Sequence, residues 1–421
     1  MAQKVSTPAL KNVISQGTRS LIRDAFANTT SKRIILNPLF LEDEKLPEAE
    51  RVAVLNEVFN RNIRVKQLER LARYMSPVLG GEIPTNLLIY GPTGTGKSVT
   101  CIHFLSNLAA MCEESKIGFR YAYVDLTTPR TCFGALNQLA LALDGTTRRY
   151  KKGIAMDYMQ EAIICALSQT SDLVCIVLDE ADNVTENNDL LFMFLAKTLP
   201  RRIRAKLVYI FLSNKLEWDK SLDPRILSVL KKTDLIFEPY DALDLVEILN
   251  LRVEKALDKS KVDPGAIRKI AAYASRETGD ARKAVELLAK AVKIAEEKKG
   301  YLGEAEVDEA ERVLEIDKTE MLVLSLASQQ KLALMACHAA FAGQKGKIST
   351  GHAYSVYCEM CNRQGYRALT QRRFSDMISL LDLYGLINAR VVSKGRFGKT
   401  RELSGSLPAE VVRKLMRDGA R

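Results

Sequence analysis

Histidine is scarce in this chain, long apolar runs are missing, and the cysteines do not follow a disulfide pattern. Three histidines among 421 residues, none set in a Ser or Asp pattern, leave little material for histidine-based acid–base or metal chemistry. No apolar run approaches the roughly 20 residues that a membrane span needs, and the N-terminal region shows no apolar core followed by a small-residue cleavage site. We therefore expect no membrane partner and a cytoplasmic, nucleoid-associated location.

The eight cysteines are scattered singly, several of them inside apolar runs, where a reduced thiol behaves as a small buried hydrophobe. This spacing does not indicate a disulfide framework. Cys358 and Cys361 form a C-x-x-C pattern, but no second cysteine pair or histidine pair stands at the spacing of a zinc site. We interpret these two thiols as ordinary helix residues.

Composition predicts a globular protein of several domains with one strongly basic end. Hydrophobic residues make up 47% of the chain and charged residues 27%, which is typical of globular proteins, and the length predicts roughly two to four domains. Residues 320–421 hold 16 Lys and Arg against 7 Asp and Glu. Such a block favours nucleic acid as a partner, with a solvated basic surface as the alternative.

The most specific motif is a phosphate-binding loop that follows the apolar run 86–90 and precedes a helix-like stretch. It consists of Gly91, Pro92, Thr93, Gly94, Thr95, Gly96, Lys97 and Ser98. The glycines let backbone N–H groups point inward, and the following helix start favours negative charge. Lys97 is predicted to reach the β- and γ-phosphates and Ser98 to hold Mg²⁺. We predict that the chain binds ATP and ADP with Mg²⁺.

Apolar, β-rich segments recur beyond this loop and are separated by helix-like stretches, at residues 119–125, 173–179, 207–213 and 235–237. This alternation predicts an α/β fold with a parallel sheet. Asp179 and Glu180 stand at the carboxyl end of a buried strand, where nucleotide sites form. We predict that Asp179 acts on the metal shell and that Glu180 orients or deprotonates the attacking water.

The letters Asp-Glu-Ala-Asp at 179–182 match the name of a helicase family, but the Ser-Ala-Thr motif and second lobe of that family are missing. The next strand ends in Asn214, which resembles the sensor-one residue of AAA+ ATPases and is predicted to contact the γ-phosphate or the attacking water. Arg225 lies at a later helix start and resembles an arginine finger that completes a neighbour's site. An exposed helix-start arginine is the alternative.

Residues 240–316 are helical in pattern, with breaks at 263–265 and 278–280, and predict a helical lid. Asp280 is the expected N-cap of a lid helix. Arg282, two residues later, is predicted to act as sensor two on the bound phosphates. Tyr240, at the hinge between core and lid, is predicted to stack on adenine with Arg252 nearby.

The C-terminal region reads as three helices followed by a hairpin, which is the order of a winged helix: 321–341, 350–363, 370–383 and two strands around 393–399. The third helix opens with residues that we expect in a major groove: Thr370, Gln371, Arg372 and Arg373. Five apolar residues are expected in its core: Phe374, Ile378, Leu381, Leu383 and Leu386. Four basic residues of the hairpin are expected on phosphates or in a minor groove: Lys394, Arg396, Lys399 and Arg401. Protein binding is the alternative role of such a domain.

Together these motifs resemble the archaeal replication initiators related to origin recognition complex subunit one and cell division control protein six. The match covers residues 60–405 and rests on five segments: 91–98, 178–182, 222–225, 237–240 and 278–284. The resemblance implies an AAA+ ATPase core with a helical lid and a C-terminal winged helix. It also implies ATP contacts at Tyr240 and Arg252, and a DNA-contacting insertion at 127–152 that includes Arg130.

The resemblance implies four regions, an N-terminal extension (1–59), a nucleotide-binding core (60–238), a lid (239–317) and a winged-helix domain (318–421). It predicts an ATP-dependent initiator, hydrolysing ATP slowly as a switch, with duplex origin DNA, the replicative helicase and initiator paralogues as partners. A branch-migration helicase and an ATP-dependent transcription regulator are the alternatives. The chain departs from the family in the polar residues 1–35 and in an acidic stretch at 42–50.

Overall fold

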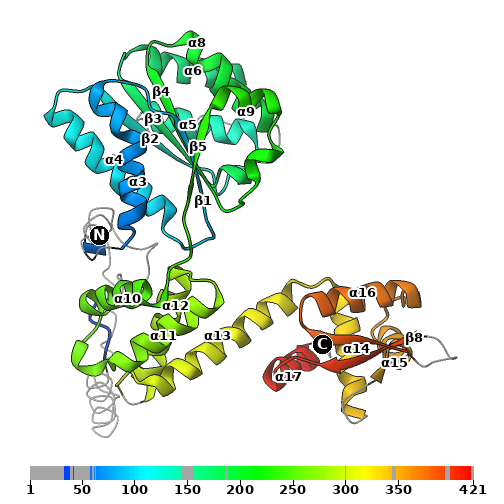
Figure 1. The fold of residues 1–421 in the computed structure, drawn as a ribbon. Coiled ribbons are helices and arrows are strands. Elements are labelled where there is room, and N and C mark those ends of the chain that lie inside the picture. Colours follow the sequence, from blue (N-terminus) through cyan, green and yellow to red (C-terminus); the bar gives the residue numbers. More distant parts are fainter. Residues whose placement is uncertain are drawn as a thin grey trace, which may run out of the picture. The chain divides into compact units, whose positions relative to one another are not determined.

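The computed structural model describes residues 33–37, 41, 57–58, 61, 63–144, 156–184, 188–298, 300–343, 348–393 and 399–418. The chain divides into two compact units, Met1–Val307 and Asp308–Arg421 (Figure 1). The first unit contains a parallel sheet with its covering helices and a group of lid helices. The second contains a small antiparallel sheet with helices.

A five-stranded parallel sheet forms the centre of the first unit. Its strands are β1 (Asn86–Tyr90), β2 (Phe119–Asp125), β3 (Leu173–Asp179), β4 (Lys206–Ser213) and β5 (Lys232–Ile236), in the order β2-β3-β4-β1-β5. The predicted α/β sheet is therefore confirmed. β5 begins earlier than the apolar pattern predicts, because its polar residues Lys232 and Thr233 pair with Asn86 and Leu87 of β1. An edge strand needs no continuous apolar run.

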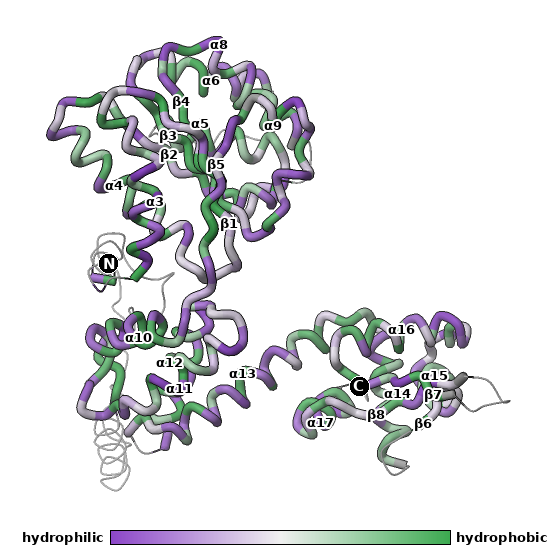
Figure 2. The backbone as a smooth tube through the Cα atoms, viewed as in Figure 1, coloured by the Kyte–Doolittle hydropathy of each residue, from purple (hydrophilic) through white to green (hydrophobic). Residues whose placement is uncertain are grey.

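Helices cover both faces of this sheet (Figure 1). One face packs against α3 (Val65–Met75) and α4 (Lys97–Glu114). The other packs against α5 (Cys132–Asp144), α6 (Met156–Ser168), α7 (Asn188–Met193), the π-helical turn η5 (Phe194–Thr198), α8 (Leu199–Arg202) and α9 (Pro224–Leu230). Strand β3 is buried at every position. The sheet around β3 and β4 is largely green in Figure 2, because both of its faces need apolar side chains, whereas the edge strand β5 is partly purple. The carboxyl ends of the strands are left to carry polar groups.

The lid consists of α10 (Ala242–Ala256), α11 (Pro264–Glu277), α12 (Ala281–Lys298) and the first residues of α13 (Glu304–Ser325). Aspartates begin three of these helices by accepting a backbone N–H: Asp241, Asp263 and Asp280. Gly279 has a φ of 61°, a conformation that glycine adopts without strain. The predicted break at 278–280 is confirmed, and so is the Asp280 cap. The break predicted at 263–265 ends at Asp263, because Pro264 and Gly265 already belong to α11.

The second unit has the winged-helix order of elements. It contains the end of α13, α14 (Ser328–Gly343), β6 (Ile348–Ser349), α15 (Thr350–Arg363), α16 (Gln371–Leu383), β7 (Ile387–Ser393), β8 (Lys399–Gly405) and α17 (Ala409–Asp418). The strands pair antiparallel in the order β6-β8-β7. Phe374, Ile378 and Leu381 of α16 are all fully buried in the core of this unit. The predicted winged-helix fold is confirmed.

Three details of this unit differ from the sequence-based expectation. The helix predicted at 321–341 is interrupted between α13 and α14, where the Ala327 N–H donates to the Gln330 side chain at 3.0 Å. The helix α17 was not predicted. Leu383, expected in the core, is 78% exposed, because it lies two residues after the buried Leu381 and therefore on the opposite side of the helix.

Within the described part of the chain, the helices are all too short or too polar to span a membrane.

Candidate functional site

The phosphate loop connects β1 to α4, and the lid approaches it closely. Gly94 and Gly96 have φ values of 69° and 81°, in the left-handed region that favours glycine. A Cβ atom on Gly94 would lie 1.6 Å from a carboxylate oxygen of Asp280, and one on Gly96 would lie 2.3 Å from the Tyr240 hydroxyl. The Ala281 N–H of the lid donates to the Gly94 carbonyl at 3.1 Å. Only glycine fits these two positions.

Lys97 is the centre of a hydrogen-bonded chain at the carboxyl ends of three neighbouring strands. Its Nζ donates to the carbonyl oxygens of Gly91 at 2.7 Å and Pro92 at 2.8 Å, and to Oδ1 of Asn214 at 2.7 Å. The Asn214 Nδ2 in turn donates to Oε2 of Glu180 at 2.5 Å. Because β4 lies between β3 and β1, Asn214 stands between the phosphate loop and Glu180. The structure thus brings the predicted residues Lys97, Asn214 and Glu180 together.

Burial and neighbouring charges both shift the pKa of Lys97, a residue that is 6% exposed. Burial lowers the pKa of its ammonium group, Glu180 and Asp179 oppose this, and the positive charge of Arg282 adds to it. Arg282 of the lid therefore lies within electrostatic reach of Lys97, and its role on the phosphates stays a prediction.

Asp182 positions Asn214, and the sequence analysis gave it no role. It is 5% exposed, and its Oδ1 accepts the Ser213 hydroxyl at 3.1 Å and the Asn214 N–H at 3.3 Å. Lys215 forms an ion pair with its other oxygen at 3.3 Å. The only sequence feature that could have pointed to Asp182 was its position in the Asp-Glu-Ala-Asp segment.

Asp179 and Ser98, the predicted Mg²⁺ ligands, both contact the hydroxyl of Tyr123 on β2. The Tyr123 hydroxyl donates to Oδ2 of Asp179. Burial and the charge of Asp179 raise the pKa of the Tyr123 phenol, and a hydrogen bond with Ser98 opposes the shift. The Ser98 hydroxyl and the Asp179 carboxylate thus share one hydrogen-bond partner, and oxygen donors of these kinds suit Mg²⁺, so the residues fit the ion. The sequence analysis did not identify Tyr123.

Tyr240 and Arg252, the predicted adenine contacts, are both buried in the structure, at 7% and 9% exposed. One face of the Tyr240 ring is already covered, since the Arg64 guanidinium carbon lies 3.9 Å from the ring centroid. The residue as a whole is only 7% exposed, so stacking of Tyr240 on adenine stays a prediction. Arg64 was another residue that the sequence motifs did not reveal.

Within the described part of the chain, Arg225 forms no hydrogen bond to Lys97, Asn214 or Glu180 and pairs with Asp223 instead. Its guanidinium donates to the carboxylate of Asp223, with the shortest distance 2.6 Å, and its side chain is 74% exposed. An exposed arginine held at a helix start suits a residue that acts on a neighbour's site.

Five of the predicted DNA contacts are exposed. Thr370 begins α16 as its N-cap, and Gln371, Arg372 and Arg373 are exposed, as is Arg130 in the β2–α5 connection. Arg401 instead donates to the Ser379 hydroxyl of α16 at 2.6 Å. Lys394 and Arg396 lie outside the described residues, as does the side chain of Lys399.

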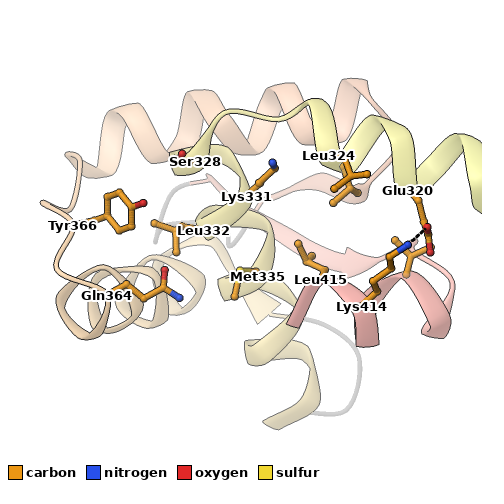
Figure 3. A pocket seen from close by; sticks show the side chains of 12 residues that line it. Glu320, Leu324, Ser328, Lys331, Leu332, Met335, Gln364, Tyr366, Lys414 and Leu415 are labelled. Carbon is orange, nitrogen blue, oxygen red and sulfur yellow. Dashed lines mark hydrogen bonds and ion pairs between the residues drawn. The ribbon is translucent and has the colours of Figure 1, made fainter. Parts of the chain in front are cut away.

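A cavity of about 310 Å³ opens in the second unit, between the end of α13, α14 and α17 (Figure 3). Its walls are mainly apolar, with Leu332, Met335 and Leu415 pointing into it, and the Lys414–Glu320 ion pair lies at its edge. None of the predicted DNA contacts lines it. The cavity and the α16 start are therefore separate features of this unit.

Three family models match the chain in the order of its folded parts. A family described as AAA domain matches residues 84–216, the Cdc6 AAA+ ATPase-type lid domain matches residues 246–312, and the CDC6 C-terminal winged helix domain matches residues 322–415. These matches coincide with the parallel sheet, the lid helices and the second unit.

Curated relatives are similar over nearly their whole length. The chain is 35% identical over 408 residues to an ORC1-type DNA replication protein of Pyrococcus furiosus, covering 93% of this chain and 95% of the relative. It is 32% identical to ORC1-type DNA replication protein 1 of Archaeoglobus fulgidus, covering 85% and 87%. Among solved structures, the Aeropyrum pernix ORC1 protein in complex with DNA is 30% identical with a TM-score of 0.67, covering 91% and 97%.

Proposed function

We propose a function for this chain, which belongs to the family of ORC1-type DNA replication proteins. It is an ATP-regulated initiator that binds duplex origin DNA and helps to recruit the replicative helicase. The observation that carries the proposal is the Lys97–Asn214–Glu180 chain beside Arg282 of the lid. The exposed residues at the start of α16 supply the matching DNA surface. We also propose that the chain has initiator paralogues as partners and is located in the cytoplasm.

In the nucleotide site, the amides and Lys97 of the phosphate loop bind the phosphates, and Tyr240 with Arg252 lines the base site. Mg²⁺, held by Ser98 and Asp179, supplies charge neutralisation at the phosphates. Glu180 orients the attacking water or takes its proton, Asn214 holds Glu180 and faces the γ-phosphate, and Arg282 stabilises charge from the lid. Lys97, Asn214 and Glu180 are already joined to one another by hydrogen bonds.

We also propose that ATP acts as a switch and that Arg225, which is 74% exposed and bonded to Asp223, serves the site of an adjacent subunit. We expect slow hydrolysis by the isolated chain and faster hydrolysis as the protein concentration rises on DNA. Arg225→Ala should remove this concentration dependence and leave nucleotide affinity unchanged. A steady-state ATPase titration checks it, and a rate per chain that is constant over concentration would contradict the shared site.

Footprinting on genomic DNA with ATP and with a non-hydrolysable analogue tests the initiator proposal. We expect protection of a defined duplex segment near an origin in both states, without strand displacement. The motor alternative, a branch-migration helicase, predicts unwinding that requires hydrolysis. Genome-wide occupancy centred on promoters would instead favour the transcription regulator.

A further inference from the structure

Arg64 immediately precedes α3 and lies outside every motif described so far. It is 7% exposed, and its φ of 63° lies in a region that residues other than glycine rarely adopt. Its Nε is buried without a hydrogen-bond partner among the described residues. Both features oppose folding, and such features concentrate at functional positions.

The Arg64 guanidinium joins the phosphate loop to the hinge of the lid. Its Nη2 donates to the carbonyl oxygen of Thr95 at 3.0 Å and to that of Glu238 at 2.6 Å. Thr95 precedes Gly96 in the phosphate loop, and Glu238 lies between β5 and α10. The following Pro239 has no N–H of its own with which to fix the hinge.

The bond to Thr95 sets the direction of the Gly96 amide. In a trans peptide the C=O and the N–H point to opposite sides. Because the Thr95 carbonyl points to Arg64, the Gly96 N–H must point away from Arg64. Phosphate loops bind phosphate oxygens with their backbone amides, so the Arg64 bond fixes the direction of one amide that can serve this purpose.

Stacking adds a third contact that ties the lid to the same loop. The guanidinium carbon lies 3.9 Å from the ring centroid of Tyr240 and 5.5 Å from that of Phe237. The Tyr240 hydroxyl approaches Gly96 so closely that a Cβ there would lie 2.3 Å from it. A planar guanidinium can stack and donate at once, whereas an ammonium group cannot do both in this geometry.

We propose that Arg64 is a positioning residue of the nucleotide site, which orients the Thr95–Gly96 peptide and fixes the hinge to it before a nucleotide binds. It acts through the loop and the Tyr240 ring rather than by touching the phosphates. The proposal rests on the nucleotide-binding function proposed above.

Arg64→Lys and Arg64→Ala test this role, with Arg61→Lys and Arg61→Ala as matched controls. Arg61 also links the segment before α3 to the lid, through Glu247 at 3.2 Å and Glu254 at 2.6 Å, but bonds neither Thr95 nor Glu238. Calorimetry of the full chain measures the affinity for ATP, ADP and inorganic tripolyphosphate. We expect both Arg64 variants to lose roughly tenfold to hundredfold for all three ligands, and the Arg61 variants to change by about twofold or less.

A spectroscopic measurement without ligand separates positioning from a general loss of stability. The sequence contains four Thr–Gly peptides, so labelling Thr with carbonyl ¹³C and Gly with ¹⁵N selects only the amides of Gly94, Gly96, Gly279 and Gly351. In Arg64→Lys we expect the Gly96 signal to shift and that of Gly351, in the second unit, to stay. Fluorescence of Trp218, the single tryptophan, verifies that the first unit is folded.

Three results would overturn the proposal. One is wild-type affinity in Arg64→Lys, and another is an unchanged Gly96 signal in a folded Arg64→Lys variant. The third is loss of ATP affinity with retained tripolyphosphate affinity, which would mean that Arg64 contributes to binding of the base and not of the phosphates. If the wild-type chain bound none of the three ligands, the proposed nucleotide function itself would fail, and the Arg64 variants would not be needed to decide it.

Discussion

At the phosphate loop, Lys97 is 6% exposed and its ammonium donates to three acceptors, whereas at the start of α16 the charged residues Arg372 and Arg373 are exposed to solvent. The first site is held by contacts that exist without a ligand. The second depends on the backbone of one helix, whose Thr370 cap accepts the Arg373 N–H, and on the buried residues beneath it.

This difference follows from what each site is proposed to bind. A small anionic ligand needs donors that are already oriented, because reorientation would reduce affinity. A nucleic acid offers many phosphates, and exposed basic side chains can adjust to them. The buried site should therefore respond steeply to single changes and the exposed one gradually.

The largest expected effect is at Lys97. Lys97→Ala should lower nucleotide affinity roughly a thousandfold, corresponding to about 4 kcal/mol, because a buried charged donor to the phosphates is removed. DNA affinity without nucleotide should stay. Fluorescent-nucleotide titration checks the first part and DNA titration the second, with the exposed Lys66→Ala as control. Equal loss of both affinities would remove the distinction between the two sites.

Core packing beneath α16 gives the next largest effect. Leu381→Ala should destabilise the second unit by about 2–5 kcal/mol, since it leaves a cavity at a fully buried position. Leu383→Ala, at an exposed position of the same helix, should change stability by less than about 0.5 kcal/mol. Pulsed alkylation of the buried Cys337 and Cys361 reports opening of this unit, while Trp218 reports the first unit. A similar effect of both substitutions would contradict the assigned faces of α16.

Acid should weaken the second unit through His338. Burial lowers the pKa of His338 to about 4, partly opposed by a hydrogen bond to the Leu386 backbone. Between about pH 4 and 6.5 the unfolded chain therefore binds more protons at this residue than the folded chain does. Stability from this residue is complete above pH 6.5 and falls toward pH 4, by on the order of 3 kcal/mol. Urea unfolding followed by circular dichroism between pH 4 and 7, with Trp218 fluorescence reporting the first unit, measures it, and His338→Gln should flatten the dependence.

The smallest expected effect is at the exposed interface. Arg372→Ala should weaken duplex binding several-fold, by about 1 kcal/mol, and reduce the salt slope of the binding constant by about one, since one phosphate or base contact is lost. The exposed Arg363→Ala on α15, whose guanidinium lies 3.8 Å from Glu359, is the control. Affinity that hardly changes between low and moderate salt would count against DNA binding by this face.

Sequence reasoning succeeded for residues whose role depends on strand order. Asp179, Glu180 and Asn214 each follow an apolar segment, and parallel strands bring such ends to one edge. It did not reveal Tyr123, whose hydroxyl bonds Asp179, because a tyrosine within a strand looks like any packed aromatic. Arg64 was missed for a similar reason, since its partners Thr95 and Glu238 are distant in the sequence.

The sequence by itself determined the phosphate loop, the alternation of strands and helices, the lid breaks and the winged-helix order, because local motifs and periodicity encode these features. Only the tertiary structure decided which of these parts touch. The strand order β2-β3-β4-β1-β5 places Asn214 between Lys97 and Glu180, and the close approach of the lid brings Asp280 and Tyr240 against Gly94 and Gly96. Long-range packing sets these contacts, and no local sequence pattern specifies them.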